Sequence, residues 1–264
     1  MDLTEAQLTD YQVTGRHPWE LARIEVVVQL LKEHIPTITT QKITILDVGC
    51  GDTYLIEQLS KKLPLTSFVA VDTAFTEQML EEYTARFAKA NTPIRVFQSL
   101  DDAAASLPVP ADVVLLLDVI EHISDDVAFL RYLQSSSCIT PNTHFFITVP
   151  AFQSLFCAHD VFLKHYRRYT NDSLQKAVTQ SNLRVVEKGY FFTSLLLPRF
   201  IQVLLEKKTK PDSAKGIGAW QENPVKDNLI KGVLLMDFKI TYLIKKLGIT
   251  IPGLSNFIVC KKAV

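Results

Sequence analysis

The chain has 264 residues, of which 47% are hydrophobic and 21% are charged, a composition typical of a globular protein that can bury a core. Its 28 basic and 28 acidic residues balance to a formal net charge of +0, so no overall attraction to nucleic acid is expected. The four cysteines lie far apart without a C-x-x-C pair, which excludes a zinc ribbon and a disulfide scaffold and favours a reducing compartment.

The amino-terminal stretch 1–12 is acidic and polar. It lacks the basic and apolar regions of a secretory signal, and no run in the chain reaches about 18 apolar residues. These features predict a cytoplasmic protein without a transmembrane helix. The balanced charge hides an asymmetry, because residues 199–264 hold 12 basic and 5 acidic residues while the remainder holds 16 and 23.

Short apolar runs alternate with helix-like segments over more than 100 residues. An amphipathic helix is expected first, at 18–31. Strands are then expected at 43–48, 67–71, 94–98, 112–117 and 144–149, with helices at 54–63, 76–90 and 125–136. This alternation predicts a parallel sheet with helices on both faces.

The rest of the chain begins with an irregular stretch at 151–169 that is rich in aromatic residues, histidine and arginine. The elements expected after it are a helix at 170–181 capped by Thr170, a strand at 183–192, an apolar helix at 194–205, a polar loop at 209–224, a helix at 225–247 and a strand at 256–261. In the long helix, apolar residues recur with a 4-3-4-3 spacing at Leu229, Val233, Met236, Ile240 and Leu243. We therefore expect a core at 1–192, a helical lid or membrane-facing subdomain at 193–255, and a final strand at 256–264 that returns to the core sheet.

A glycine turn follows the first expected strand. Gly49 and Gly51 can adopt positive φ and let a ligand approach the backbone and the next helix amides. Asp72 ends the second strand, where a carboxylate can accept both hydroxyls of a ribose. Neither phosphate-binding pattern is met, because Tyr54 replaces the third glycine of G-x-G-x-x-G and no G-K-S/T occurs. A nucleoside that carries positive charge instead of phosphates fits Asp47, the acid before the glycines.

Three motifs resemble those of class I S-adenosylmethionine-dependent methyltransferases of the small-molecule and quinone-type branch. Residues 45–51 (ILDVGCG) resemble motif I, 69–72 (VAVD) the second motif, and 112–122 (DVVLLLDVIEH) the strand-four motif. Their order and spacing match across 43–149, and 159–169 (HDVFLKHYRRY) resembles some bacterial members more weakly. The resemblance implies a three-layer α/β, Rossmann-like fold with a seven-stranded, mostly parallel sheet, and S-adenosyl-L-methionine as the cofactor.

The resemblance also implies where the cofactor binds. Asp47, Gly49 and Gly51 would border its methionine part, Asp72 would hold the ribose hydroxyls, Ser99 and Leu100 would border the adenine, and Asp118 and Val119 would lie beside the transferred methyl group and the adenine. Asp52 stands where a third glycine is common, which leaves the details of the methionine pocket open. Asp101 and Asp102 either contact the adenine or cap a helix.

Oxygen acceptors of a methyl group usually need a general base, and ligands bind beyond the carboxyl ends of the strands. The candidate bases there are His122, His159 and His165. An ordered loop pinned by arginine–carboxylate pairs would equally explain the polar residues of 159–169.

Asp118, Glu121 and His122 form a D-x-x-E-H pattern whose members share one face of a helix or turn. With a further histidine the pattern can bind a divalent cation, as a related arrangement does in some relatives, but it also occurs in metal-free members. We expect it to line the pocket without a metal.

These observations predict a methyltransferase that acts on a small hydrophobic or lipid-linked acceptor, with oxygen as the acceptor atom. The basic, apolar tail would cover the acceptor and contact an anionic membrane through Lys207, Lys208, Lys210, Lys245 and Lys246, unless it is only core packing with solvated lysines. The competing function is a non-catalytic adaptor of the same fold. The acceptor's identity and the oligomeric state stay open.

Overall fold

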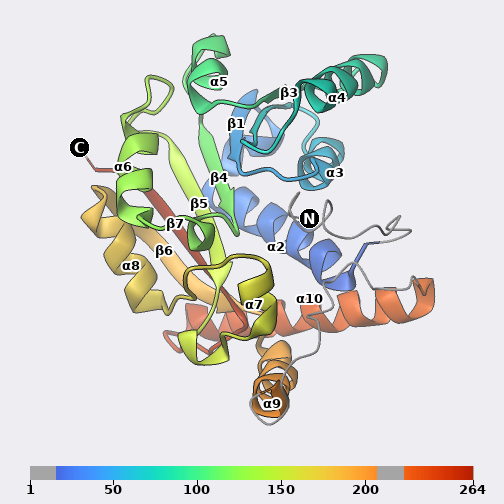
Figure 1. Cartoon of the computed structure of the whole chain (residues 1–264), viewed down its shortest axis with the longest axis vertical. Coiled ribbons are helices and arrows are strands. Elements are labelled where there is room, and N and C mark those ends of the chain that lie inside the picture. The colour runs from blue at the N-terminus through green and yellow to red at the C-terminus, as the bar shows by residue number, and fades with distance from the viewer. Residues whose placement is uncertain (1–15, 207–222, 264) are drawn as a thin grey trace.

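The computed structural model describes residues 16–206 and 223–263. Its centre is a seven-stranded sheet in the order β3-β2-β1-β4-β5-β7-β6 (Figure 1). The strands are β1 (Ile43–Val48), β2 (Thr66–Val71), β3 (Ile94–Phe97), β4 (Val113–Leu117), β5 (His144–Pro150), β6 (Leu183–Phe191) and β7 (Ser255–Lys262). The first five strands pair in parallel and β7 runs antiparallel to both β5 and β6. The seven-stranded, mostly parallel sheet expected from the sequence is therefore confirmed.

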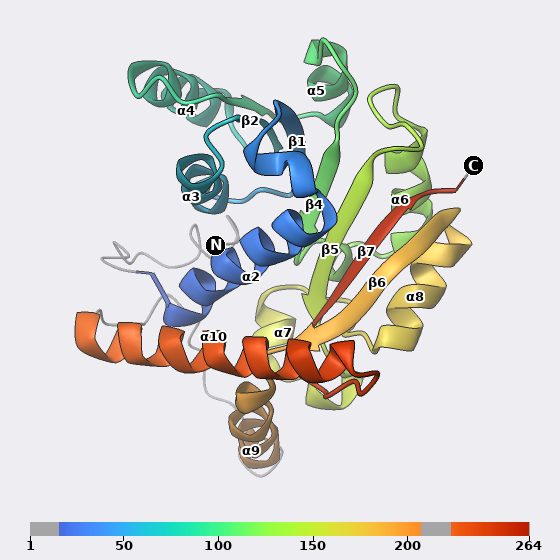
Figure 2. The same cartoon turned by 180° about the vertical axis from the view of Figure 1, so that it is seen from behind.

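Helices cover both faces of this sheet and bury two separate cores (Figures 1 and 2). One face is covered by α2 (Pro18–His34), α3 (Tyr54–Lys62), α4 (Glu77–Lys89) and α10 (Pro224–Lys246), the other by α5 (Leu100–Ser106), α6 (Asp126–Ser135) and α8 (Asn171–Gln180). Successive side chains of a strand point to opposite faces of the sheet. In β1, Ile45 therefore packs in the first core and Leu46 in the second.

The expected elements agree with the structure to within about two or three residues at each end. The Thr170 side chain caps α8 as expected and accepts a hydrogen bond from the Ser173 N–H (3.2 Å). Two short helices were not expected, α5 and α7 (Ala158–Phe162). The polar loop expected at 209–224 lies mostly outside the described residues, as do Lys207, Lys208 and Lys210.

The carboxyl-terminal helices differ from each other in their packing. α9 (Leu196–Glu206) projects from the body, while α10 lies across α2 and the end of β6 (Figure 2). Leu234, Phe238 and Tyr242 of α10 are buried in the core. The stripe expected from Leu229 to Leu243 lies on the other face, where its members are 52–68% exposed. Within the described chain, no helix is long and apolar enough to cross a membrane.

Candidate functional site

A cavity of about 700 Å³ lies beyond the carboxyl ends of β1, β2, β4 and β5. Its lining includes six of the residues expected to bind the cofactor, namely Asp47, Gly49, Gly51, Asp72, Asp118 and Val119. The three candidate bases, His122, His159 and His165, line the same cavity. Residues from four distant parts of the sequence thus meet where parallel sheets bind ligands.

Ser99 and Leu100 are not among the residues that line this cavity. The Ser99 hydroxyl caps α5 by accepting from the Asp101 N–H (3.1 Å), and Leu100 is buried in the second core. Asp101 lies in the first turn of α5 and accepts a hydrogen bond from the Tyr132 hydroxyl (2.8 Å). The structure therefore gives these residues packing and capping contacts on α5, outside the lining of this cavity, and their contact with the adenine stays a prediction.

The glycine turn depends on backbone conformations that favour glycine. Gly49 and Gly51 have φ values of 74° and 62°. A Cβ atom on Gly49 would lie 2.7 Å from Cγ2 of Val119. The Gly51 N–H donates to Oδ2 of Asp72 (2.9 Å), and the Ala74 N–H donates to Oδ1 (3.0 Å). Because each carboxylate oxygen can accept more than one hydrogen bond, Asp72 is fixed in place and can still accept from a ligand.

Asp47 is 2% exposed at the end of β1. Burial raises its pKa to about 7, an effect that the nearby Arg23 opposes and Asp72 reinforces. A cationic ligand beside such a carboxylate would restore its charged form. This environment fits the ammonium and sulfonium groups of S-adenosylmethionine and gives no cradle for a phosphate.

Arg23 is a site residue that the sequence analysis missed. It projects from α2, forms an ion pair with Asp118, and lies over the Trp19 ring at 4.6 Å from the ring centre. Asp118 also accepts a hydrogen bond from the Thr148 hydroxyl (3.1 Å) and has a φ of 59°. The signal in the sequence was an arginine on a helix that is otherwise mostly apolar, and Arg23 is indeed only 9% exposed.

The opposite part of the cavity contains the histidines. Glu121 and His122 lie in a 3₁₀ turn, Ile120–His122, directly after β4. The His122 and His165 rings meet edge to face with centres 4.5 Å apart. Glu121 is fully buried, and neither of its carboxylate oxygens has a hydrogen-bond partner. Burial, followed by the nearby charge of Asp118, raises the pKa of Glu121 well above its usual range.

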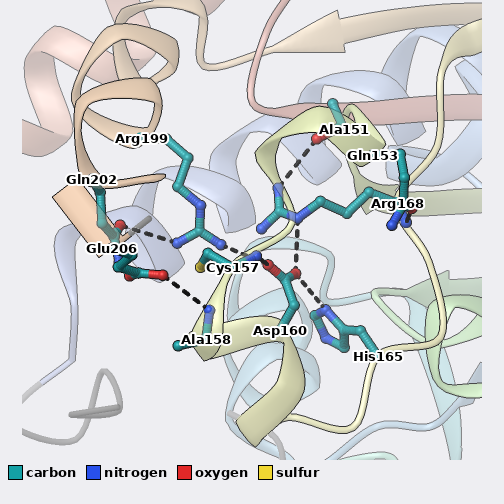
Figure 3. Close-up of polar contacts among 10 residues, drawn as sticks. All are labelled: Ala151, Gln153, Cys157, Ala158, Asp160, His165, Arg168, Arg199, Gln202 and Glu206. Atoms are coloured by element: carbon teal, nitrogen blue, oxygen red, sulfur yellow. Dashed lines mark hydrogen bonds and ion pairs between the residues drawn. The ribbon is translucent and has the colours of Figure 1, made fainter. Parts of the chain in front are cut away.

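A buried carboxylate, Asp160 of α7, organises the segment that carries His165 (Figure 3). It accepts hydrogen bonds from His165 Nδ1 (2.9 Å), Arg168 Nε (2.8 Å) and Arg199 Nη2 (3.1 Å). Burial alone would raise the Asp160 pKa, but these donors hold it well below its usual range. The arginine–carboxylate pairs considered from the sequence are present, and they position a histidine in the cavity.

His159 lies on the same short helix and also lines the cavity. Burial lowers its pKa to about 4, and the nearby charge of Arg199 adds to this shift. His159 is therefore neutral at pH 7 and has a nitrogen lone pair that can accept a proton.

Some residues of the segment 193–255, for which the sequence predicts a lid or membrane-facing subdomain, line the cavity. Pro198, Arg199 and Gln202 of α9 line the cavity, and Glu206 accepts a hydrogen bond from the Ala158 N–H (3.0 Å; Figure 3). No residue of α10, all of which is described, lines it. The long helix is a structural layer over α2 and β6, because its buried face contributes to the core.

Residues 21–188 match a family model described as a methyltransferase domain. No curated protein sequence matches the chain. Among solved structures, the chain resembles a Galdieria sulphuraria protein provisionally named a sarcosine dimethylglycine methyltransferase, with a TM-score of 0.56, 14% identity and coverage of 92% of this chain and 86% of that one.

Two plantazolicin methyltransferases, both solved with S-adenosylhomocysteine, are similar in fold. BamL gives a TM-score of 0.55 at 11% identity and covers 99% of this chain and 90% of its own. BpumL gives 0.52 at 14% identity, with 94% and 85% covered. The family match spans the strands that carry the glycine turn, Asp72 and the D-x-x-E-H pattern. The chain therefore belongs to the methyltransferase-domain family, and it is an S-adenosylmethionine-dependent methyltransferase.

Proposed function

We propose that the protein transfers a methyl group to an oxygen atom of a small hydrophobic or lipid-linked acceptor. One observation carries this proposal: one cavity joins the carboxylates near the glycine turn to the candidate bases His122, His159 and His165, beside α9, a helix with exposed apolar side chains. The carboxylates suit a cationic cofactor, and the histidines suit an acceptor that must lose a proton.

The residues at the glycine turn bind and orient the cofactor. When bound, S-adenosylmethionine supplies an electrophilic methyl group on its sulfonium. Asp72 accepts from the ribose hydroxyls, while Gly49 and Gly51 leave room for the methionine part. Asp47 and Asp118 lie where the cationic part of the cofactor would bind, and their negative charge favours the binding of that cation.

At the histidine end, the chain positions the acceptor and receives its proton. An acceptor hydroxyl that took up the methyl group of a bound cofactor would release its proton, which the chain must receive. The hydroxyl proton passes to an imidazole nitrogen of His122, His159 or His165. The buried network around Asp160 fixes the loop that carries His165, which keeps the acceptor in line with the methyl group.

We also propose that α9 and α10 contact a membrane surface through which the acceptor arrives. On α9 the exposed apolar side chains are Leu197, Phe200, Ile201, Leu204 and Leu205. On α10 they include the stripe from Leu229 to Leu243, which Lys239 accompanies as an exposed cation. Lys245 and Lys246 contribute less than the sequence suggested, because they form ion pairs with Glu187 and Glu33.

The test is methyl transfer from isotopically labelled cofactor to a panel of hydrophobic alcohols, phenols and hydroquinones, and to a cellular lipid extract. We expect an O-methylated product in the organic phase, identified by mass spectrometry. His159→Asn and His165→Asn should lower kcat while leaving S-adenosylhomocysteine binding intact. A product methylated at nitrogen or carbon would overturn the oxygen assignment, and label found only in water-soluble products would overturn the hydrophobic acceptor.

A further inference from the structure

Three potential metal ligands converge at the acceptor end of the cavity. Glu121, His122 and His165 each offer one ligand atom, and these atoms all lie within 4.8 Å of one another. Two atoms that each lie about 2.0–2.2 Å from one cation are at most about 4.4 Å apart, so small rotations of these side chains suffice to bring all three onto one cation. The two histidines come from loops 43 residues apart in sequence and are brought together by the fold.

Glu121 is the unusual member of this group. Its side chain is 0% exposed, and neither oxygen has a hydrogen-bond partner among the described residues. A buried carboxylate without a partner is costly, and proteins normally pair such groups or use them to coordinate a metal. Within the described chain, the charges of Arg23 and Arg168 act on Glu121 from nearby, but neither arginine hydrogen-bonds to its oxygens.

His165 is already oriented as a metal-ligating histidine would be. Its Nδ1 hydrogen-bonds to Asp160 (2.9 Å), which leaves Nε2 as the nitrogen that can coordinate a cation (Figure 3). A carboxylate behind a histidine is a common outer-shell arrangement at metal sites, because it fixes the tautomer and the ring orientation.

The nearby arginines do not prevent cation binding. Arg168 and Arg199 are both paired with Asp160, and Arg23 is paired with Asp118. The positive charges around the cluster are thus matched by carboxylates other than Glu121.

We propose that Glu121, His122 and His165 bind a divalent transition-metal cation. Two imidazoles and one carboxylate favour Zn²⁺, Co²⁺ or Fe²⁺ over Mg²⁺, which prefers oxygen ligands. This assignment differs from the metal-free pocket expected from the sequence, because the sequence alone did not place His165 beside His122.

The role of the cation rests on the proposed function. A site with three protein ligands keeps positions open toward the cavity, where an acceptor hydroxyl can coordinate and lose its proton more readily. His159 is not part of the cluster and remains available to receive that proton.

The experiment uses the full chain after treatment with a chelator and dialysis. Zn²⁺ binding is measured by calorimetric titration, and Co²⁺ binding is followed by the visible absorption of the bound ion. We expect saturable binding of one ion per chain. Glu121→Gln and His165→Gln each remove a proposed ligand atom and should weaken it by at least about 10- to 100-fold, the loss that changes to outer-shell partners already cause. His144→Gln is the matched control, because His144 lies at the start of β5 and outside the cavity lining, and its affinity should equal that of the wild type.

Retained binding of S-adenosylhomocysteine will show that the variants are folded. If they are not, the wild-type protein still decides the matter: Zn²⁺ should shift the imidazole NMR signals of two of the six histidines. Absence of saturable binding, unchanged affinity in both cluster variants, or a shift of other histidines would overturn the site. Metal binding without any O-methylation would instead overturn the proposed function and leave the site standing.

Discussion

At the residue scale, Asp72 fixes the glycine turn, because its carboxylate accepts hydrogen bonds from the Gly51 and Ala74 N–H groups. Under the proposed function, the same carboxylate also accepts from the ribose hydroxyls. We expect Asp72→Ala to weaken S-adenosylhomocysteine binding by about 2–4 kcal/mol, or roughly 30- to 1,000-fold, in a calorimetric titration. Asp101→Ala removes an exposed carboxylate outside the cavity and should leave the affinity for S-adenosylhomocysteine unchanged. Equal affinities for both variants would contradict the ribose assignment.

Two glycines should respond oppositely to alanine. Gly49→Ala places a Cβ 2.7 Å from Val119 in a left-handed conformation, so we expect a loss of about 1–3 kcal/mol in unfolding free energy and weaker cofactor binding. Gly232→Ala, in the middle of α10, meets no atom within 4 Å and should stabilise by about 0.5–1 kcal/mol. Urea unfolding with and without S-adenosylhomocysteine measures the stability and the ligand binding of both variants. A Gly49→Ala protein that is as stable as the wild type and binds the ligand equally well would show that the turn tolerates a side chain.

At the scale of elements, Glu187 joins β6 to two helices. It pairs with His34 of α2 (2.6 Å) and with Lys245 of α10, and it accepts from the Tyr242 hydroxyl (3.1 Å). Burial raises the Glu187 pKa, but the hydrogen bonds from His34 and Lys245 outweigh it and lower the pKa from 4.5 to about 2. The folded state thus binds a proton less readily than the unfolded state, and the stabilisation is complete above the unfolded pKa.

This stabilisation should disappear as the pH falls from about 4.5 to about 2. We expect Glu187→Gln to lower the unfolding free energy by about 1–3 kcal/mol at pH 7 and to match the wild type near pH 2. Urea unfolding of both proteins across this pH range gives the difference between their unfolding free energies. Other acids such as Asp160 contribute equally to both proteins, so their contribution cancels in this difference. A difference independent of pH would mean that packing, and not the carboxylate charge, holds α10 in place.

For the whole molecule, most of the exposed large apolar side chains of the described residues belong to α9 and α10. These two helices lie at the same end of the molecule (Figures 1 and 2), in a part of the chain with an excess of basic residues. We expect binding to anionic vesicles at low salt, with each nearby lysine contributing about 1 kcal/mol, and a steep decrease by about 0.15 M salt, where the Debye length is about 8 Å. Co-sedimentation measures it. Met236→Glu should abolish binding, whereas Val109→Glu, at a similarly exposed position far from both helices in sequence, should not. Wild-type protein that stays in the supernatant would contradict membrane contact.

The sequence by itself determined the strands, most helices and the cofactor turn of this protein. Local sterics favour a strand for the β-branched apolar run and positive φ for the two glycines that follow it. The acid after β2 lies at the carboxyl end of a parallel strand, where such sheets bind ligands. Asp47, Gly49, Gly51 and Asp72 could therefore be placed before the structure, and all four line the cavity.

The tertiary structure decided what depends on residues far apart in the chain. Arg23 reaches Asp118 across 95 positions. His165 meets His122 because the loop of His165 is held by Asp160 and by a hydrogen bond from the Tyr166 N–H to the Glu121 carbonyl (2.8 Å). Periodicity predicted an apolar face on α10 but not which face is buried. That helix has two apolar faces, and Phe238 and Tyr242 enter the core while Met236 and Ile240 remain outside. The spacing of apolar residues predicts that a helix has an apolar face. Which face is buried depends on the elements that pack against the helix in the folded protein, here α2 and β6.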